Sequence, residues 1–284
     1  MAIYSITAIL LITVFVSLSG TMVPLLSLAL LIPFGFFLCG IATGEKRKEL
    51  KQLYKFSVVQ PLLEEYFSDL SYYPDRGITE AQLKETQMID TDDYFTSNDL
   101  VTGSYKGIGF SQSDVMIEEK QEQTDTDGQI DTNYSTTFKG RFIIFDFIRS
   151  FSSNFLIVQN TVEAYLIPGK KRDGTKFRKY STGDSEFDRY FSVYHGNITA
   201  PYSILTPEFI GKLKHIGEIT AGPLLLCFYN NKLYVGIDDR TDAFEPDSDN
   251  DDSEKAQEEK IRREIHLITD ILDTLMMDDI GFFE

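Results

Sequence analysis

The 284-residue sequence contains no tryptophan, only two cysteines and only three histidines. Cys39 lies in an uncharged apolar segment and Cys227 stands alone in the remainder, so we expect no disulfide within the soluble part, and a reducing compartment is allowed. His195, His215 and His266 are too widely separated to form a metal-ligand pair by spacing. We therefore predict no metal site and no cofactor, and no residue has the spacing of catalytic machinery.

Charge is also absent from the first 44 positions, whereas all 27 basic and all 44 acidic residues follow them. One helix of that length would extend about 66 Å, roughly twice the ~30 Å hydrocarbon core of a bilayer. A break at SLSGTMVP divides the segment into two spans, at about residues 3–18 and 23–42. The alternatives are a signal peptide followed by one span, which normally begins with positive charge, or a buried soluble hairpin. We predict a transmembrane hairpin over residues 1–44 that anchors the chain in the lipid bilayer.

The orientation of this hairpin follows from the basic residues just after it. The connecting turn carries no charge, and a membrane-surface group of five follows the second span: Lys46, Arg47, Lys48, Lys51 and Lys55. By the positive-inside rule this group stays in the cytoplasm, so both termini are expected there. The opposite topology, with the domain outside, remains an alternative.

The soluble remainder carries the whole formal net charge of -17. A nucleic-acid partner is therefore not expected, because the phosphate backbone requires many lysines and arginines.

Residues 45–90 have the pattern of a helical stalk beside the membrane. Apolar residues recur every three or four positions as far as about Leu70, and Pro61 is expected to kink or restart the helix. Thr79 is expected to cap a second short helix.

Beyond residue 90 the patterns are mostly those of strands. DVMIEEKQEQ and TTFKGRFIIFDF, on either side of a turn-rich segment, predict a long hairpin, and Asn230 with Asn231 predicts a tight turn of positive φ. Thr206, Pro207 and Gly217 have the positions of an N-cap, a first residue and a residue past the last turn of a helix.

The chain closes with an acidic loop at 245–260 and an amphipathic helix over 253–277, which we expect to pack on the sheet. Together these patterns predict an α+β fold in which residues 91–284 form a cytoplasmic domain with a largely antiparallel β-sheet.

The stretch from Tyr134 to Phe151 alternates between polar and apolar residues and then becomes continuously apolar from Phe142 to Phe145. This change predicts a strand that begins with one face in water and ends covered on both faces. Asp146 follows the run. It is either a carboxylate with a raised pKa or, as we favour, the partner of Arg141 or Arg149 in an ion pair.

Three other patterns that evoke chemistry have simpler interpretations. Asp247 to Glu258 places acidic residues at four positions of a calcium loop, but Asp252 stands where a glycine is needed, so a solvated acidic linker is favoured. Cys227 lies among apolar residues, where an inert buried thiol is expected. Gly103 to Phe110 lacks the spacing of a phosphate-binding loop and predicts a turn that enters a strand.

Several motifs in a fixed order resemble a bacterial family, domain of unknown function 3137 (DUF3137). They are GIGFSQSDVMIEEK, TTFKGRFIIFDF, FDRYFSVY, PYSILTPEFIGKL, LYVGI and DAFEP, between about Tyr105 and Pro246, with the closing helix. The resemblance implies a membrane-attached protein with an N-terminal hairpin and, as a possible partner, a membrane protein of the LemA type. It implies no catalytic residues.

These observations predict a non-enzymatic module at the bacterial inner membrane that binds a protein or a ligand. The alternative is a membrane-bound enzyme that acts on a lipid or envelope precursor at a site assembled from distant residues. A deep pocket that converges on Asp146, His195 or Glu118 would favour the enzyme.

Overall fold

The computed structural model describes residues 46–86, 88–89, 91, 93–124, 130–148, 150–151, 155–161, 171–172, 175–176, 178–195, 205–246 and 254–276. The chain divides into two compact units, Met1–Tyr54 and Lys55–Glu284. The predicted transmembrane hairpin lies outside the described residues. Where the structure is described, no helix is both long and apolar enough to cross a membrane.

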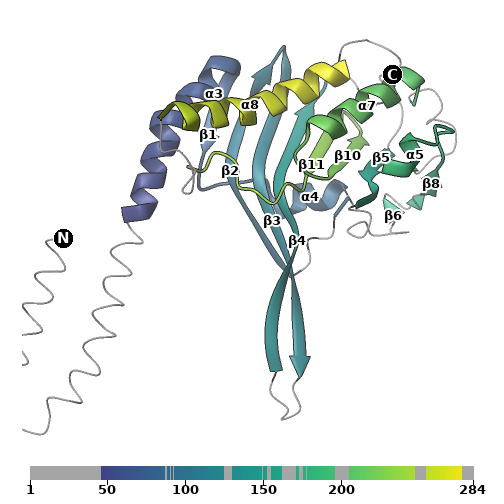
Figure 1. Cartoon of the computed structure of the whole chain (residues 1–284), viewed down its shortest axis with the longest axis horizontal. Helices are drawn as coiled ribbons and strands as arrows, with labels where there is room; N and C mark the ends of the chain where they lie inside the picture. Colours follow the sequence, from purple (N-terminus) through teal and green to yellow (C-terminus); the bar gives the residue numbers. More distant parts are fainter. Residues whose placement is uncertain are drawn as a thin grey trace, which may run out of the picture. The chain divides into compact units, whose positions relative to one another are not determined.

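The second unit is built on one nine-stranded sheet with the order β1-β2-β3-β4-β11-β10-β5-β9-β8 (Figure 1). Every neighbouring pair is antiparallel, which confirms the predicted antiparallel sheet of an α+β fold. The sheet begins with β1, which lies inside the segment 45–90 that was predicted as a helical stalk. Two further short strands, β6 and β7, pair with each other. The strands are β1 Ser68–Tyr73, β2 Tyr94–Tyr105, β3 Ile108–Thr124, β4 Ile130–Asp146, β5 Phe155–Gln159, β6 Lys171–Arg172, β7 Thr175–Lys176, β8 Arg178–Tyr180, β9 Phe191–His195, β10 Leu224–Tyr229 and β11 Lys232–Ile237.

Helices cover both faces of this sheet. α8 lies beside α7 and α3 on one face (Figure 1), and the apolar stripe of α8 is buried, as predicted for the closing helix. α4 packs on the opposite face, where Leu83 and Met88 join a core cluster with strand residues. The helices are η1 Lys55–Val59, which is a π-helix, α3 Gln60–Tyr66, α4 Glu80–Thr86, α5 Phe187–Tyr190, α7 Pro207–Ile219 and α8 Glu254–Met276.

Strand β4 explains the continuous apolar run in the sequence. Phe142 and Ile144 belong to the core cluster on the α4 face. Ile143 and Phe145 are equally buried and point to the other face, because successive side chains of a strand alternate. The prediction of a strand covered on both faces is therefore confirmed.

Most predicted caps and turns are confirmed. The Thr206 side chain accepts a hydrogen bond from the Phe209 amide at 3.2 Å, and the Thr79 side chain accepts one from the Gln82 amide at 3.3 Å. Asn230 has φ 54° in the β10–β11 turn, and Lys106 with φ 50° precedes Gly107 in the β2–β3 turn.

Two expectations about helix ends were wrong. The N-terminal helical pattern ends at Tyr66 rather than near Leu70, because Ser68–Tyr73 pairs with β2 as an edge strand. α7 continues through Gly217 to Ile219. Gly217 is needed there for another reason: a Cβ atom at this position would lie 2.8 Å from Cζ of Phe191.

The hairpin of β3 and β4 extends beyond its neighbouring strands (Figure 1). β2 pairs with β3 no further than Glu118, and β11 pairs with β4 no further than Arg141. We call residues 119–124 and 130–135 the hairpin arm. Its two strands pair with each other, while no strand of the described chain pairs with their outer edges.

Candidate functional site

The ion pair predicted for Asp146 has a different partner. Asp146 pairs with Lys232, its cross-strand neighbour, and the expected pairing with Arg141 is wrong. Arg141 precedes Asp146 by five residues on the same strand, so the two side chains point to opposite faces of the sheet. Arg141 faces α8, where its Nη1 donates a hydrogen bond to the backbone oxygen of Glu264 at 3.2 Å. Arg149 lies outside the described residues.

Lys55 also differs from the prediction. Lys46, Arg47, Lys48 and Lys51 are exposed, but Lys55 is buried, with Nζ 2.7 Å from Oδ2 of Asp99 and 2.8 Å from Oε1 of Glu245. It therefore cannot belong to a membrane-surface group. Burial alone would lower the pKa of Lys55, but the hydrogen bonds and charges of Asp99 and Glu245 outweigh it and raise that pKa.

Asp99 is the centre of this buried cluster. Its carboxylate accepts hydrogen bonds from Lys55, from the Tyr72 hydroxyl at 2.5 Å and from the Asn98 amide at 2.6 Å. Its backbone has φ 55° at an irregularity in the β2–β3 pairing, while Lys55 belongs to the π-helix. Such backbone irregularities persist only where surrounding contacts hold them. Sequence analysis did not identify this cluster, because its members are distant in the chain and only the polar pair Asn98–Asp99 within a strand hints at it.

Other buried carboxyls lie near this cluster. Asp114 accepts a hydrogen bond from the Ala243 amide at 2.7 Å, and its second oxygen has no hydrogen-bond partner among the described residues. Burial raises the pKa of the Asp114 carboxyl well above its ordinary value, and the charge of Asp99 adds to this rise. Burial likewise raises the pKa of Glu264 on α8.

The histidines and Cys227 do not come together. His195 is buried at the end of β9, His215 is on α7, and His266 on α8 contacts Tyr66. Cys227 is fully buried, as predicted. In the ranges that the structure describes, no group of side chains has the arrangement of a metal site. The candidate calcium loop lies mostly outside those ranges.

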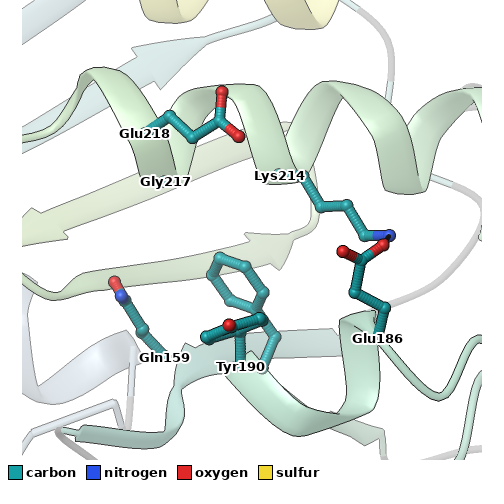
Figure 2. Close-up of a pocket in the computed structure, with 7 residues that line it drawn as sticks. Gln159, Glu186, Tyr190, Lys214, Gly217 and Glu218 are labelled. Carbon is teal, nitrogen blue, oxygen red and sulfur yellow. Dashed lines mark hydrogen bonds and ion pairs between the residues drawn. The ribbon is translucent and has the colours of Figure 1, made fainter.

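One pocket, of about 360 Å³, lies between α5 and α7 (Figure 2). Lys214 from α7 reaches Glu186 at 2.7 Å, and Tyr190 and Gln159 line the opposite side. Gly217 leaves room for the ring of Phe191. The pocket is lined by polar side chains together with the ring of Phe191, a mixed lining that is typical of a ligand-binding hollow.

A second pocket, of about 340 Å³, lies where the end of α7 meets α8; we call it the α7–α8 pocket. Arg141, the polar candidate from the sequence, lines it together with Asp239 and Glu264. Three basic residues contribute to its wall: Arg141, Lys260 and Arg263. The sequence indicated Arg141 as a possible ion-pair partner of Asp146, but it carries no local signal for the helix residues that meet Arg141 here.

These observations define an α+β domain with an antiparallel sheet covered on both faces, a projecting hairpin and two open pockets. The model of the family described as "Protein of unknown function (DUF3137)" matches residues 136–277, which is half of the chain. The chain belongs to the DUF3137 family.

A comparison with solved structures found the mycobacterial trehalose monomycolate transport factor A, TtfA. The two chains are 13% identical, with a TM-score of 0.40, over 80% of this chain and 96% of that chain. No curated protein sequence matches this chain.

Proposed function

We propose that this DUF3137 protein is a non-enzymatic binding module tethered to the bacterial inner membrane, and that it binds another protein through the hairpin arm. The arm is the observation that carries the proposal. Strand edges without a neighbour present rows of backbone donors and acceptors, and an extended segment of a partner can add to them as a further strand.

The side chains of the arm support this use. Ile130 and Tyr134 are exposed, and Tyr134 contacts Tyr94 with ring centroids 5.0 Å apart. Acidic residues outnumber basic ones on the described arm. It carries three carboxylates, on Glu119, Glu122 and Asp131, and one lysine, Lys120. Charges also protect edges against self-association. The partner that fits is therefore an extended segment of basic character, and a LemA-like membrane protein is the candidate that the family resemblance offers.

One edge amide is already occupied. The backbone amide of Lys120 donates to Oδ2 of Asp93 at 2.8 Å. Arg240 likewise donates to the carbonyl of Thr136, just beyond the arm. These contacts leave the β4 edge from Ile130 to Ser135 as the edge that we assign to the partner.

The membrane part of the proposal is supported by the sequence. The uncharged residues 1–44 would form two spans, and four exposed basic residues follow them: Lys46, Arg47, Lys48 and Lys51. In this arrangement both termini and the sheet domain are cytoplasmic.

The enzyme alternative gains no specific support. It depended on a pocket that converges on Asp146, His195 or Glu118, and neither pocket described above is lined by these residues.

The proposal is tested by purification from membranes in mild detergent with three baits. They are the full chain, the full chain carrying Ile130→Asp and Tyr134→Asp, and the anchor of residues 1–44 alone. We expect a protein that co-purifies with the first bait and not with the other two. A specific partner that binds the arm variant equally well would rule out the arm, and the absence of any specific partner would contradict the binding function.

A further inference from the structure

We propose that the α7–α8 pocket binds a small oxyanion, a phosphate or carboxylate group, through the buried Arg141 and the exposed Arg263. This site is separate from the hairpin arm and does not depend on the function proposed for it. The inference rests on a cavity, on a buried cation in its wall whose hydrogen bonds are incomplete, and on two further cations beside it.

The side chain of Arg141 is held in place, but not all of its N–H donors have hydrogen-bond acceptors. Its side chain is 8% exposed, and Nη1 is fixed by the backbone oxygen of Glu264. Among the described residues, its buried Nε has no hydrogen-bond partner, because Oδ2 of Asp239, with which it forms an ion pair, is 3.6 Å away. A guanidinium presents five N–H donors, and a buried donor that lacks an acceptor is costly. An oxyanion beside the guanidinium, with the small adjustment of Asp239 that this requires, would supply acceptors.

The other cations of the wall also have free donors. The Lys260 ammonium donates to the Glu245 backbone oxygen at 2.7 Å and lies 3.9 Å from Oε1 of Glu264, so it is not saturated. Arg263 is exposed and makes no hydrogen bond or ion pair within the described part of the chain. Arginine favours carboxylate and phosphate because its planar fork matches their oxygens.

The carboxylates of the wall are less available to a ligand. Oδ1 of Asp239 accepts from the amide and hydroxyl of Thr241 at 3.0 and 2.8 Å, and Oε2 of Glu264 accepts from the Phe244 amide at 2.8 Å. Asp270 is the exposed acidic residue of the wall. In the described part of the chain, donors without acceptors therefore remain on all three cations of the wall, and an acceptor-rich ligand beside Arg141 and Arg263 would satisfy them.

The volume fits this chemistry. A space of about 340 Å³ is large enough for a phosphate or carboxylate with a small organic group attached. Ile219, Ala221 and Leu267 supply apolar wall for such a group.

The test is equilibrium binding of inorganic phosphate and, separately, of acetate to the full chain in detergent, at constant ionic strength. Arg263→Gln removes an exposed cation of the site and should not disturb folding. Arg189→Gln on α5 removes an exposed arginine elsewhere and is the matched control.

We expect saturable binding of one or both anions, weakened about tenfold by Arg263→Gln and unchanged by Arg189→Gln. Binding by phosphate alone or acetate alone identifies the oxyanion. The proposal is overturned if neither anion binds saturably. It is also overturned if both variants weaken binding equally, because the loss would then reflect the lower positive charge of the protein and not this pocket.

Discussion

Among single residues, Asp99 has the most demanding surroundings of the described chain. Its buried carboxylate is shared by Lys55, Tyr72 and Asn98, and its own backbone is in the left-handed region. A buried pair of this kind is costly to break from one side, because the remaining charge loses its partner and cannot reach water. Lys55 and Asp99 therefore hold η1 against β2 as a unit.

Replacing Lys55 with methionine should lower the free energy of unfolding by about 3–5 kcal/mol, since Asp99 and Glu245 would be left without their cation. Lys106→Met is the control. Lys106 pairs with Asp273 on the surface, so little change is expected there. Urea unfolding of the full chain in detergent measures both variants. Equal effects of the two replacements would show that the buried pair does not stabilise the domain.

Asp114 predicts a pH dependence. Its folded pKa is raised, so its contribution to stability is fully present below the unfolded pKa of about 3.9 and is lost as the pH rises through the folded value. Burial is the main cause of the raised pKa; the charges of Asp99 and Asp242 add to it, and the charge of Arg141 and the hydrogen bond from the Ala243 amide oppose it.

The Asp114→Asn variant has no carboxyl group to ionise at this position. Its free energy of unfolding should therefore increase relative to that of the unmodified protein as the pH rises above about 4. Urea midpoints across this range, with Asp131→Asn on the exposed arm as the control for charge, measure the change. A difference between Asp114→Asn and the unmodified protein that stays constant with pH would contradict the assignment.

Among the elements, α7 contains two glycines with opposite roles. An added Cβ at Gly211 meets nothing within 4 Å, so Gly211→Ala should stabilise the protein by about 0.5–1 kcal/mol through helix propensity. An added Cβ at Gly217 would press on the ring of Phe191, so Gly217→Ala should destabilise it by about 1–3 kcal/mol. Thermal or urea unfolding of the two variants and of the unmodified protein measures these changes in stability. Stabilisation by both replacements would mean that Phe191 moves aside freely.

The elements that could be predicted from sequence are those with local signals. The β3–β4 hairpin, the Thr206 cap and the closing helix follow from alternation, capping residues and helical periodicity, and the structure confirms them. The end of the first helix was mispredicted because pairing with β2 overrides the helical pattern of Ser68–Tyr73.

The sites were harder to predict because their partners are distant in sequence. Lys55 and Asp99 are 44 positions apart, and Arg141 meets Glu264 across 123 positions. Charge runs and strand patterns identify the basic group and Arg141 but give no information on which carboxyl each side chain meets. Lys55 was therefore grouped with its exposed neighbours, and Arg141 with Asp146.

At the scale of the whole molecule, we predict that the C-terminus is cytoplasmic. The two proposed spans, which precede the basic residues Lys46, Arg47, Lys48 and Lys51, would return the chain to its starting side. A fluorescent reporter that matures only in the cytoplasm, fused after Glu284, should therefore be bright. A dark fusion, together with activity of a reporter that requires the outside, would contradict the topology.

Site-specific photo-crosslinking in membranes tests directly whether the hairpin arm binds a partner. A photoreactive residue replaces Tyr134 on the arm or, as the matched control, Tyr190 on α5; the two side chains are 49% and 54% exposed. We expect a discrete crosslinked product from position 134 that is absent from position 190 and is lost with Ile130→Asp. Crosslinking from position 190 alone, or from neither position, would contradict it.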